Sequence, residues 1–390
     1  MFTQKDILER GVAEIIKGDS LKKKLKSGKK LRVKFGIDPT GPDIHLGHTA
    51  PLWKLKQFQE LEHKVVLIIG DFTATIGDPT GQNEERKVLS EEEVKENMKQ
   101  YVEQAGKILD IKKTEIHYNS VWHKKRGIRG LLELARTVTT PQLFKRAAFQ
   151  ERMEKHIFEI SPIEFLYPLF QGYDSVEVRA DIEIGGTDQI FNLLMGRQVQ
   201  QRFGQAPQDV ITLPLLLGTD GVKKMSKSYG NYIAIQDKPY DMFGKVMSIR
   251  DNEITQYFEL VTPVSFDEVE KMKKQEIAGK TARDLKIRLA RTITELYWGE
   301  KEAEKAQKKF EVQFQKKDIP KNISTHKTNA GNTIVNLLTE IKFVNSKSEA
   351  KRLIQQGGVY IDDKKTTDFE LIPKKPFTLR VGRRKIIKIV

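Results

Sequence analysis

This chain of 390 residues, 38% hydrophobic and 31% charged, has the composition of a globular protein and enough length for two or three domains. It has no cysteine, no run of 18 apolar residues and no secretory signal over residues 1–20, so disulfides, cysteine–zinc sites and thiol catalysis are excluded and a cytoplasmic location is expected. The formal net charge is +15, and residues 321–390 hold 15 Lys/Arg against 6 Asp/Glu, which fits either a polyanionic partner or a lysine-rich solvated surface.

Strands and helices alternate along the first part of the chain. One helix is predicted after His48, and another over 90–109, where Ser90 and Glu93 form a capping box. The predicted strands are residues 31–38, 63–71, 115–120 and 209–218. The second of these is continuously apolar, which is typical of a parallel sheet covered on both faces. The pattern predicts an α/β fold, with a doubly wound, Rossmann-like parallel-sheet domain over residues 1–222.

The character of the sequence changes after this point. Residues 223–318 predict an α-helical domain, in which Leu285, Leu289 and Ile293 share one face with Leu296. Residues 319–332 are polar with Pro and Gly and predict a linker. Two short helical patterns and three strand-like pieces then predict a small α+β domain over residues 333–390.

A first motif, His45-Leu-Gly-His48, stands between a predicted strand and a predicted helix. The two histidines could be metal ligands or core residues, but no third metal ligand is evident nearby. A helix N-terminus offers free N–H groups to an anion, and ligands of such sheets bind at the carboxyl ends of the strands. Gly47 would let a nucleotide approach the backbone, so this position favours a phosphate site.

A second motif, Lys224-Met-Ser-Lys227-Ser228, lies far downstream. Its lysines, serines and flanking glycines predict a mobile cationic loop suited to charge that builds up on a departing pyrophosphate. A lone basic loop is usually a solvated surface, but the pair of motifs is specific. Together they resemble the two signatures of the class I aminoacyl-tRNA synthetases.

Three further stretches narrow this resemblance. The segments "YPLFQGYD" (167–174), "IEIGGTDQIFNLLMGRQ" (182–198) and "GDFTATIGDPTG" (70–81) are similar to the tyrosyl-tRNA synthetase family. Tyr167, Gln171 and Asp174 are spaced to share one helix face. An aspartate there can accept a hydrogen bond from a phenol.

The resemblance implies roles for individual residues. Thr40 and His45 would contact the leaving phosphates, His48 the nucleotide, and Lys224 and Lys227 the developing pyrophosphate charge. The implied ATP-binding residues are Asp38, Gly47, Gly186, Asp188, Met225, Ser226, Lys227 and Ser228. The implied tyrosine-binding residues are Gly36, Asp78, Tyr167, Gln171, Asp174 and Gln189. Of these, Asp174 would contact the substrate hydroxyl and Gln189 would lie near the carboxylate. The substrate ammonium group would be held by Asp78, Tyr167 and Gln171. ATP would enter with Mg²⁺ as substrate, and no resident metal or tightly bound cofactor is expected.

One position departs from the family pattern. Where much of the family has a tyrosine that also contacts the substrate hydroxyl, this chain has Lys34. We therefore expect another partner for the hydroxyl, and Asp71 is a candidate.

The C-terminal block resembles a small RNA-binding module found in a ribosomal protein and in pseudouridine synthases. Ser348 is expected to cap a helix that presents Lys347, Lys351 and Arg352. Such a basic unit suits phosphate contacts with tRNA, although a basic accessory domain without that role is the alternative.

The sequence thus predicts a tyrosine–tRNA ligase that uses ATP and L-tyrosine to form tyrosyl-adenylate and pyrophosphate, then transfers tyrosine to the 3′-terminal adenosine of tRNA. The resemblance implies a homodimer, and the lack of a long apolar run predicts no membrane partner. Three alternatives remain: a tryptophan ligase, a smaller nucleotidyltransferase with the same histidine motif, and an RNA-binding protein derived from a synthetase.

Overall fold

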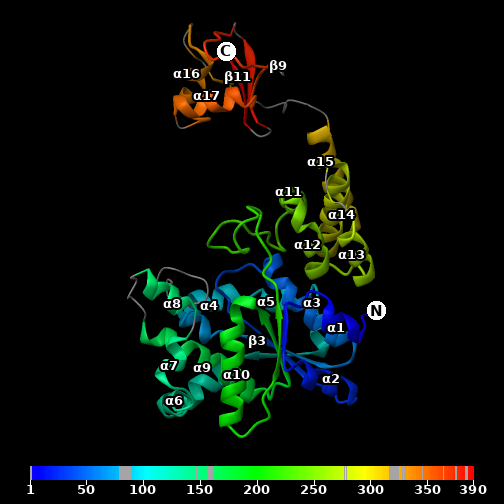
Figure 1. Ribbon diagram of the computed structural model, residues 1–390, viewed down its shortest axis with the longest axis vertical. Helices are drawn as coiled ribbons and strands as arrows, with labels where there is room; N and C mark the ends of the chain where they lie inside the picture. The colour runs from blue at the N-terminus through cyan, green and yellow to red at the C-terminus, as the bar shows by residue number, and fades with distance from the viewer. Residues whose placement is uncertain are drawn as a thin grey trace. The chain divides into compact units, whose positions relative to one another are not determined.

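The computed structural model divides into two compact units, Met1–Phe310 and Glu311–Val390 (Figure 1). The predicted boundary between residues 222 and 223 lies inside the first unit and stays a prediction. Most of the predicted linker over 319–332 lies outside the described residues. The structure describes the whole chain except residues 1, 79–88, 146, 156–160, 276, 278, 316–324, 327, 329–330, 345, 363, 374–375 and 383–384.

A six-stranded sheet forms the centre of the first unit, in the order β1-β6-β5-β2-β3-β4. Its strands are β1 (Glu14–Ile16), β2 (Arg32–Ile37), β3 (Lys64–Ile69), β4 (Thr114–Tyr118), β5 (Ile182–Gly186) and β6 (Asp209–Leu213). All neighbours pair in parallel except β1, which runs antiparallel to β6 at one edge. The chain order reverses between β2 and β5, so the predicted doubly wound parallel sheet is confirmed.

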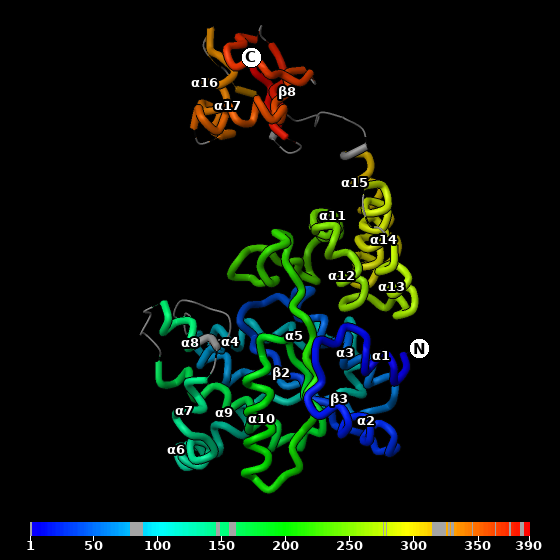
Figure 2. The backbone as a smooth tube through the Cα atoms, in the orientation of Figure 1, coloured from blue at the N-terminus to red at the C-terminus, as the bar shows by residue number. Residues whose placement is uncertain are grey.

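Helices cover both faces of this sheet, as the backbone trace shows (Figure 2). The helices of this part are α1 (Gln4–Glu9), α2 (Gly18–Lys26), α3 (Leu46–Glu60), α4 (Glu91–Met98), α5 (Tyr101–Ala105), α6 (Ser120–Ala135), α7 (Thr140–Phe144), α8 (Ala147–Glu154), α9 (Pro162–Glu177) and α10 (Ile190–Arg202). Short 3₁₀ turns lie at Thr73–Thr75, Ile111–Lys113, Thr187–Gln189 and Asp251–Glu253. Helix α3 packs against β2, β3 and β5, while α10 packs against α9, β5 and β6.

Alternate residues of β3 belong to different cores. Val65, Leu67 and Ile69 join the core that contains α3, whereas Val66 and Ile68 join the core that contains α9 and α10. A strand buried on both faces has no polar side, which explains its continuous apolar sequence. On β2 the position facing the second core is Lys34, and this residue shapes the site described below.

The predicted helix over 90–109 is two helices. Ser90 and Glu93 form the expected capping box at the start of α4. The break falls before Tyr101, whose hydroxyl donates to the Gly41 carbonyl at 2.7 Å. Gln104 donates to the Pro42 carbonyl at 2.9 Å, and these tertiary bonds hold α5 on its own axis.

After a non-helical stretch that holds the lysine loop, the first unit is mostly helical from residue 239 on, as predicted. The helices are α11 (Pro239–Met247), α12 (Ile254–Val261), α13 (Phe266–Lys273), α14 (Gly279–Trp298) and α15 (Glu300–Gln315), and the last of these runs past the end of the unit at Phe310. Leu289 and Ile293 of α14 are fully buried, and Leu285 and Leu296 pack beside them. Arg10 ties this part to the N-terminal segment by donating to four backbone carbonyls at residues 258–264.

The second unit has its own apolar core and a five-stranded sheet. Its elements are β7 (Thr325–His326), α16 (Ile334–Glu340), α17 (Lys347–Gln355), β8 (Val359–Ile361), β9 (Lys364–Lys365), β10 (Phe377–Val381) and β11 (Lys385–Ile389). Gly357, with a φ of 72°, makes the turn from α17 into β8. The cap of α17 is Ser346, which accepts from the Glu349 N–H, so the prediction of Ser348 was wrong.

Candidate active site

A cavity of about 810 Å³ lies at the carboxyl ends of β2 and β5, where the chain order of the sheet reverses. Open α/β sheets bind their ligands at such a reversal. Every residue that the sequence analysis assigned to ATP or tyrosine lines this one cavity, apart from the alternative hydroxyl partner Asp71. They are Gly36, Asp38, Thr40, His45, Gly47, His48, Asp78, Tyr167, Gln171, Asp174, Gly186, Asp188, Gln189, Lys224, Met225, Ser226, Lys227 and Ser228.

The two histidines stand at the first turn of α3. Their rings stack with centroids 3.7 Å apart, and His45 is buried. Burial, and after it the charge of Lys227, lowers the pKa of His45 to about 3, so its imidazole is neutral at pH 7. A side chain at position 47 would come within 3.1 Å of the His45 ring, which explains the glycine between the histidines.

The lysine loop packs onto this helix start. The Gly47 N–H donates to the Met225 sulfur at 3.3 Å, and the Lys227 ammonium donates to the Tyr101 hydroxyl at 3.4 Å. Burial lowers the pKa of Lys227 to about 8, against the opposing charge of Asp43. The two motifs, separated along the chain, therefore face the same space.

Lys224 makes a different contact. Its Nζ atom lies 2.6 Å from a carboxylate oxygen of Asp188, which stands just after β5. One end of the loop is thus bound to the β5 side of the cavity, while the Lys227 side chain lies beside Gly41, in the loop after β2.

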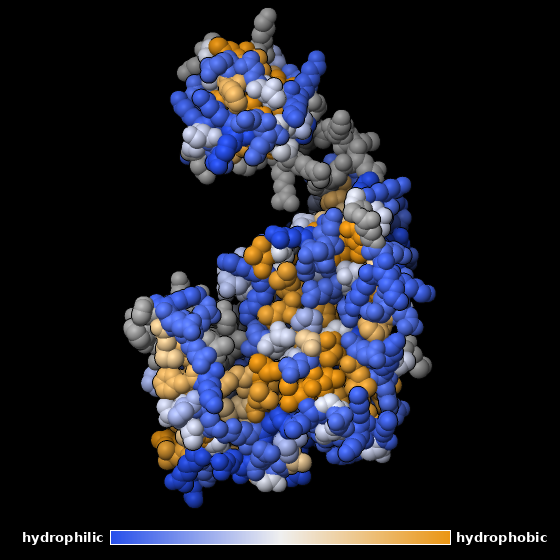
Figure 3. All heavy atoms as spheres, in the orientation of Figure 1, coloured by the Kyte–Doolittle hydropathy of each residue, from blue (hydrophilic) through white to orange (hydrophobic). Residues whose placement is uncertain are grey.

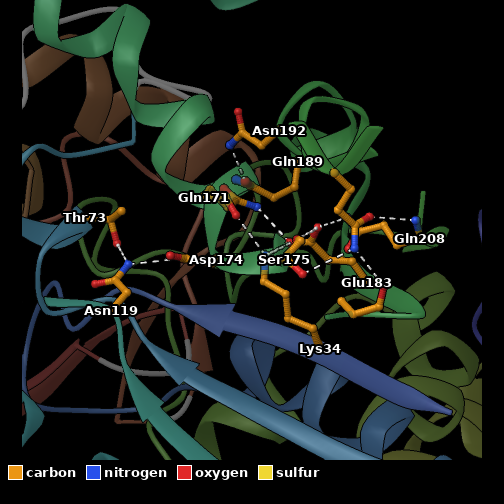
Figure 4. A network of polar contacts seen from close by, with 12 residues as sticks. Lys34, Thr73, Asn119, Gln171, Asp174, Ser175, Glu183, Gln189, Asn192 and Gln208 are labelled. Carbon is orange, nitrogen blue, oxygen red and sulfur yellow. Dashed lines mark hydrogen bonds and ion pairs between the residues drawn. The ribbon is translucent and has the colours of Figure 1, made fainter. Parts of the chain in front are cut away.

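Asp174 on α9 is nearly inaccessible to solvent, and three donors hold its carboxylate. Its Oδ1 atom accepts from the Trp122 indole at 2.8 Å and from His123 Nε2 at 2.9 Å. Its Oδ2 atom accepts from Asn119 at 3.2 Å (Figure 4). All three donors come from the chain that leaves β4 and begins α6.

Lys34 is fully buried beneath α9 (Figure 4). Its ammonium donates to the Gln171 carbonyl at 3.0 Å, to the Ser175 hydroxyl at 2.8 Å and to Glu183 at 2.8 Å. Glu183 also accepts from the side chains of Gln171, Ser175 and Gln208. All three N–H bonds of the ammonium have partners within the protein, so Lys34 has no donor left for a ligand.

The candidate partner for the hydroxyl, Asp71, does not line the cavity. Its carboxylate accepts from the backbone N–H of Ser120 at 2.9 Å and from the Ser120 hydroxyl at 2.6 Å. Asp71 therefore holds the first turn of α6, which carries Trp122 and His123.

Further hydrogen bonds link predicted residues to one another. The Tyr167 hydroxyl donates to Asp38 at 2.8 Å, and Gln189 donates to Asp78 at 2.7 Å. Asn192 in turn donates to Gln189 at 2.7 Å. These bonds restrict the rotation of the side chains that they join.

The described residues contain no cluster of three or more His, Cys, Asp or Glu side chains that could hold a metal ion. His45 and His48 therefore lack, within that part of the chain, the further ligands that a zinc site needs. Among the same residues, no helix is long and apolar enough to cross a membrane.

Sequence reasoning missed Thr73, Asn119, Trp122, His123 and Glu183. Thr73 and Glu183 line the cavity, and the other three hold Asp174. A signal for Asn119, Trp122 and His123 was their place at or just after the carboxyl end of the predicted strand 115–120, where the ligands of such sheets bind. No local pattern marks Glu183 as the partner of a buried lysine.

In the C-terminal unit, Lys347, Lys351 and Arg352 are exposed on α17, as predicted. Figure 3 shows hydrophilic side chains over much of the visible face of this unit. The arrangement offers positive charge on one helix, which is suited to a phosphate backbone.

Comparison with known proteins agrees with this geometry. Residues 26–315 match the family described as tRNA synthetases class I (W and Y), and residues 311–380 match the tyrosine–tRNA ligase SYY-like C-terminal domain. The tyrosine–tRNA ligase of Thermotoga maritima is 49% identical over 99% of this chain and 97% of that protein. The enzyme of Francisella tularensis is 48% identical over 99% of this chain and 98% of that protein.

Solved structures share the fold. The tyrosyl-tRNA synthetase of Archaeoglobus fulgidus, in complex with L-tyrosine, superposes with a TM-score of 0.63 at 22% identity and covers 77% of this chain and 98% of its own. A truncated mitochondrial tyrosyl-tRNA synthetase of Aspergillus nidulans gives a TM-score of 0.66 at 22% identity, covering 79% of this chain and 93% of its own.

Proposed function

Because this chain belongs to the tyrosine–tRNA ligase family of class I tRNA synthetases and charges tRNA with tyrosine, we propose that both steps of the reaction take place in the cavity at the carboxyl ends of β2 and β5. In the first step, a carboxylate oxygen of tyrosine attacks the α-phosphorus of ATP, and pyrophosphate leaves. In the second step, a ribose hydroxyl of the tRNA 3′-terminal adenosine attacks the tyrosyl carbonyl carbon, and AMP leaves.

One observation carries this proposal: a single cavity joins two kinds of polar groups. Its lining includes the two histidines and the loop lysines, and it also includes Asp174, Gln171 and Asp78. The first set suits phosphates and the second suits an amino acid with a phenol. A reaction between ATP and tyrosine needs both sets within reach of each other.

On the tyrosine side, we assign the substrate hydroxyl to Asp174. The Gln171 Nε2 group donates to Glu183, so its Oε1 atom is left to accept from the substrate ammonium group. Asp78 and Tyr167 would complete that ammonium site. Gly36 leaves room beside the substrate because no atom lies within 4 Å of the place a Cβ would take. Gln189 would lie near the reacting carboxylate.

On the ATP side, catalysis consists of positioning and charge stabilisation. Thr40 and His45 would donate to the leaving phosphates, and His48 would contact the nucleotide. Asp188 would bind the ribose, and the Lys224 ammonium, which contacts Asp188 in this structure, would move toward the phosphates. Lys227 would meet the negative charge that grows on pyrophosphate. The remaining ATP contacts are assigned to Asp38, Gly47, Gly186, Met225, Ser226 and Ser228.

Mg²⁺ enters with ATP as part of the substrate, since the described residues offer no ligand cluster of their own. The exposed cations of α17 would contact the tRNA backbone. We propose that the reaction takes place in the cytoplasm. We also propose that the first unit divides into a catalytic and a helical domain near residue 222.

We also propose a homodimer. Large apolar side chains are exposed on three helices that lie together in the first unit: Val121, Ile128 and Leu132 on α6, Phe144 on α7 and Ile163 on α9. Ile128 is 79% exposed, and such an apolar group is typical of a protein interface. Light scattering would detect the dimer, and Ile128→Glu should convert it to monomers.

ATP–pyrophosphate exchange tests the activity. Exchange should require tyrosine and should be absent with tryptophan or with no amino acid. Exchange that depends on tryptophan would overturn the assignment, because the wider family includes ligases for both amino acids.

A further inference from the structure

We propose that His123 is a specificity-determining residue that acts through Asp174: it positions the carboxylate that selects tyrosine over phenylalanine. The inference rests on the proposed function, because it assumes that Asp174 reads the substrate hydroxyl. His123 does not line the cavity, so it acts as a positioning residue and not as a catalytic one.

The first argument is the number of donors on each oxygen of Asp174. A carboxylate oxygen accepts about two hydrogen bonds. Oδ1 already accepts two, from Trp122 and His123, while Oδ2 accepts one from Asn119. Oδ2 is therefore the atom with capacity for a phenol hydroxyl. Because Trp122 and His123 both hold Oδ1, the carboxylate cannot rotate to present Oδ1 to the substrate in place of Oδ2.

The second argument is that the His123 ring has no freedom to turn. Its side chain is 1% exposed. The ring stacks on Phe72 with centroids 4.9 Å apart and meets Phe170 edge-on at 5.1 Å. Tyr173 and Trp122 lie near it at 5.9 and 6.2 Å. These aromatic neighbours hold Nε2 on Asp174 and exclude water, which strengthens the hydrogen bond.

The third argument is that the other side of Asp174 offers no substitute. At position 34 the family pattern has a tyrosine, but here the Lys34 ammonium is saturated by Gln171, Ser175 and Glu183. Asp71 is held by Ser120 and does not line the cavity. Support for hydroxyl recognition thus comes from the first turn of α6, and His123 supplies one of its three bonds.

The test compares four variants of the full-length protein in ATP–pyrophosphate exchange, with kcat/KM measured for tyrosine and for phenylalanine. His123→Leu removes the donor. His123→Gln retains an N–H group at nearly the same reach, and His123→Asn is polar but too short. His63→Leu is the control, because His63 directly precedes β3, at the amino end of that strand, and accepts from the Leu31 N–H.

We expect His123→Leu and His123→Asn to lower the tyrosine-to-phenylalanine ratio of kcat/KM by roughly tenfold or more, as the loss of one charge-assisted hydrogen bond implies. The loss should fall on tyrosine, while kcat/KM for phenylalanine and the KM for ATP stay near wild type. His123→Gln should retain most of the ratio, and His63→Leu should leave it unchanged.

An unchanged ratio in His123→Asn would overturn the inference. An equal loss of kcat/KM for both amino acids would also overturn it, because such a loss means that the pocket has collapsed. If His123→Leu does not fold, the comparison of Gln with Asn decides the matter. Failure of the proposed function is a separate result: wild-type protein would then show no exchange that depends on tyrosine.

Discussion

Lys34 and Glu183 form an ion pair of 2.8 Å between neighbouring parallel strands, and their side chains are 0% and 1% exposed. The pair lies under α9, where the lysine also binds the Gln171 carbonyl and the Ser175 hydroxyl. Helix α9 carries Gln171 and Asp174 on its cavity side. The ion pair therefore helps to fix the position of α9 on the sheet and its rotation about its own axis. This helix is the one that is proposed to recognise tyrosine.

The first prediction concerns stability. Lys34→Met should lower the free energy of unfolding by about 3–5 kcal/mol, because it leaves the Glu183 carboxylate buried without a cation. The double variant Lys34→Met with Glu183→Gln should recover most of this loss, since no buried charge remains. Urea unfolding of the three proteins measures both effects.

An exposed pair provides the control for this prediction. Lys30 and Glu62 lie 3.3 Å apart with side chains that are 62% and 80% exposed. Lys30→Met should cost less than about 1 kcal/mol. A destabilisation by Lys34→Met no larger than that of Lys30→Met would show that the buried pair does not hold α9.

The sequence predicted the sheet well because buried parallel strands have a pattern of their own, as Val65–Ile69 illustrates. It also identified many of the groups that line the cavity, because the two motifs and the α9 segment are local in the chain, although it missed Thr73 and Glu183. It did not predict what holds those groups. The contact between His123 and Asp174 joins residues 51 positions apart, and neither residue is unusual in its own segment.

Two further misses have the same cause. The break before Tyr101 depends on hydrogen bonds to the loop after β2, which no helical periodicity records. Ser346 and Ser348 are equivalent candidates by residue type, and only the backbone path decides that Ser346 is the cap.

The second prediction concerns His45. Replacement by alanine should slow adenylate formation on the order of 10²-fold while tyrosine binding changes little, because the proposed contact strengthens as charge moves to the leaving phosphates. Single-turnover rates and equilibrium binding of tyrosine separate the two quantities. Since the pKa of His45 is about 3, no loss of activity near pH 6 should be traceable to it. Recovery of the variant by added zinc would instead indicate a metal site.

The third prediction concerns the C-terminal unit. Replacing Lys347, Lys351 and Arg352 by glutamine should weaken tRNA binding and reduce the slope of log Kd against log salt by about 0.7–0.9 for each phosphate that the variant no longer neutralises. ATP–pyrophosphate exchange should not change. As a control, glutamine at Lys22, Lys23 and Lys26, which are exposed on α2, removes the same charge from the first unit. Equal effects of the two triple variants would mean that only net charge matters.

The fourth prediction uses the pKa of Lys227. Burial lowers it from the ordinary value of 10.5 to about 8, so the ammonium is lost as the pH rises through about 8. Only the protonated lysine can stabilise pyrophosphate, and kcat/KM for ATP reports groups that titrate before ATP binds. With tyrosine saturating, this parameter should be level below pH 7 and should fall above about pH 8. Lys227→Arg should lose this decline, because a guanidinium stays charged throughout the range. A decline that is the same in wild type and Lys227→Arg would assign the titration to another group and remove Lys227 from the proposed chemistry.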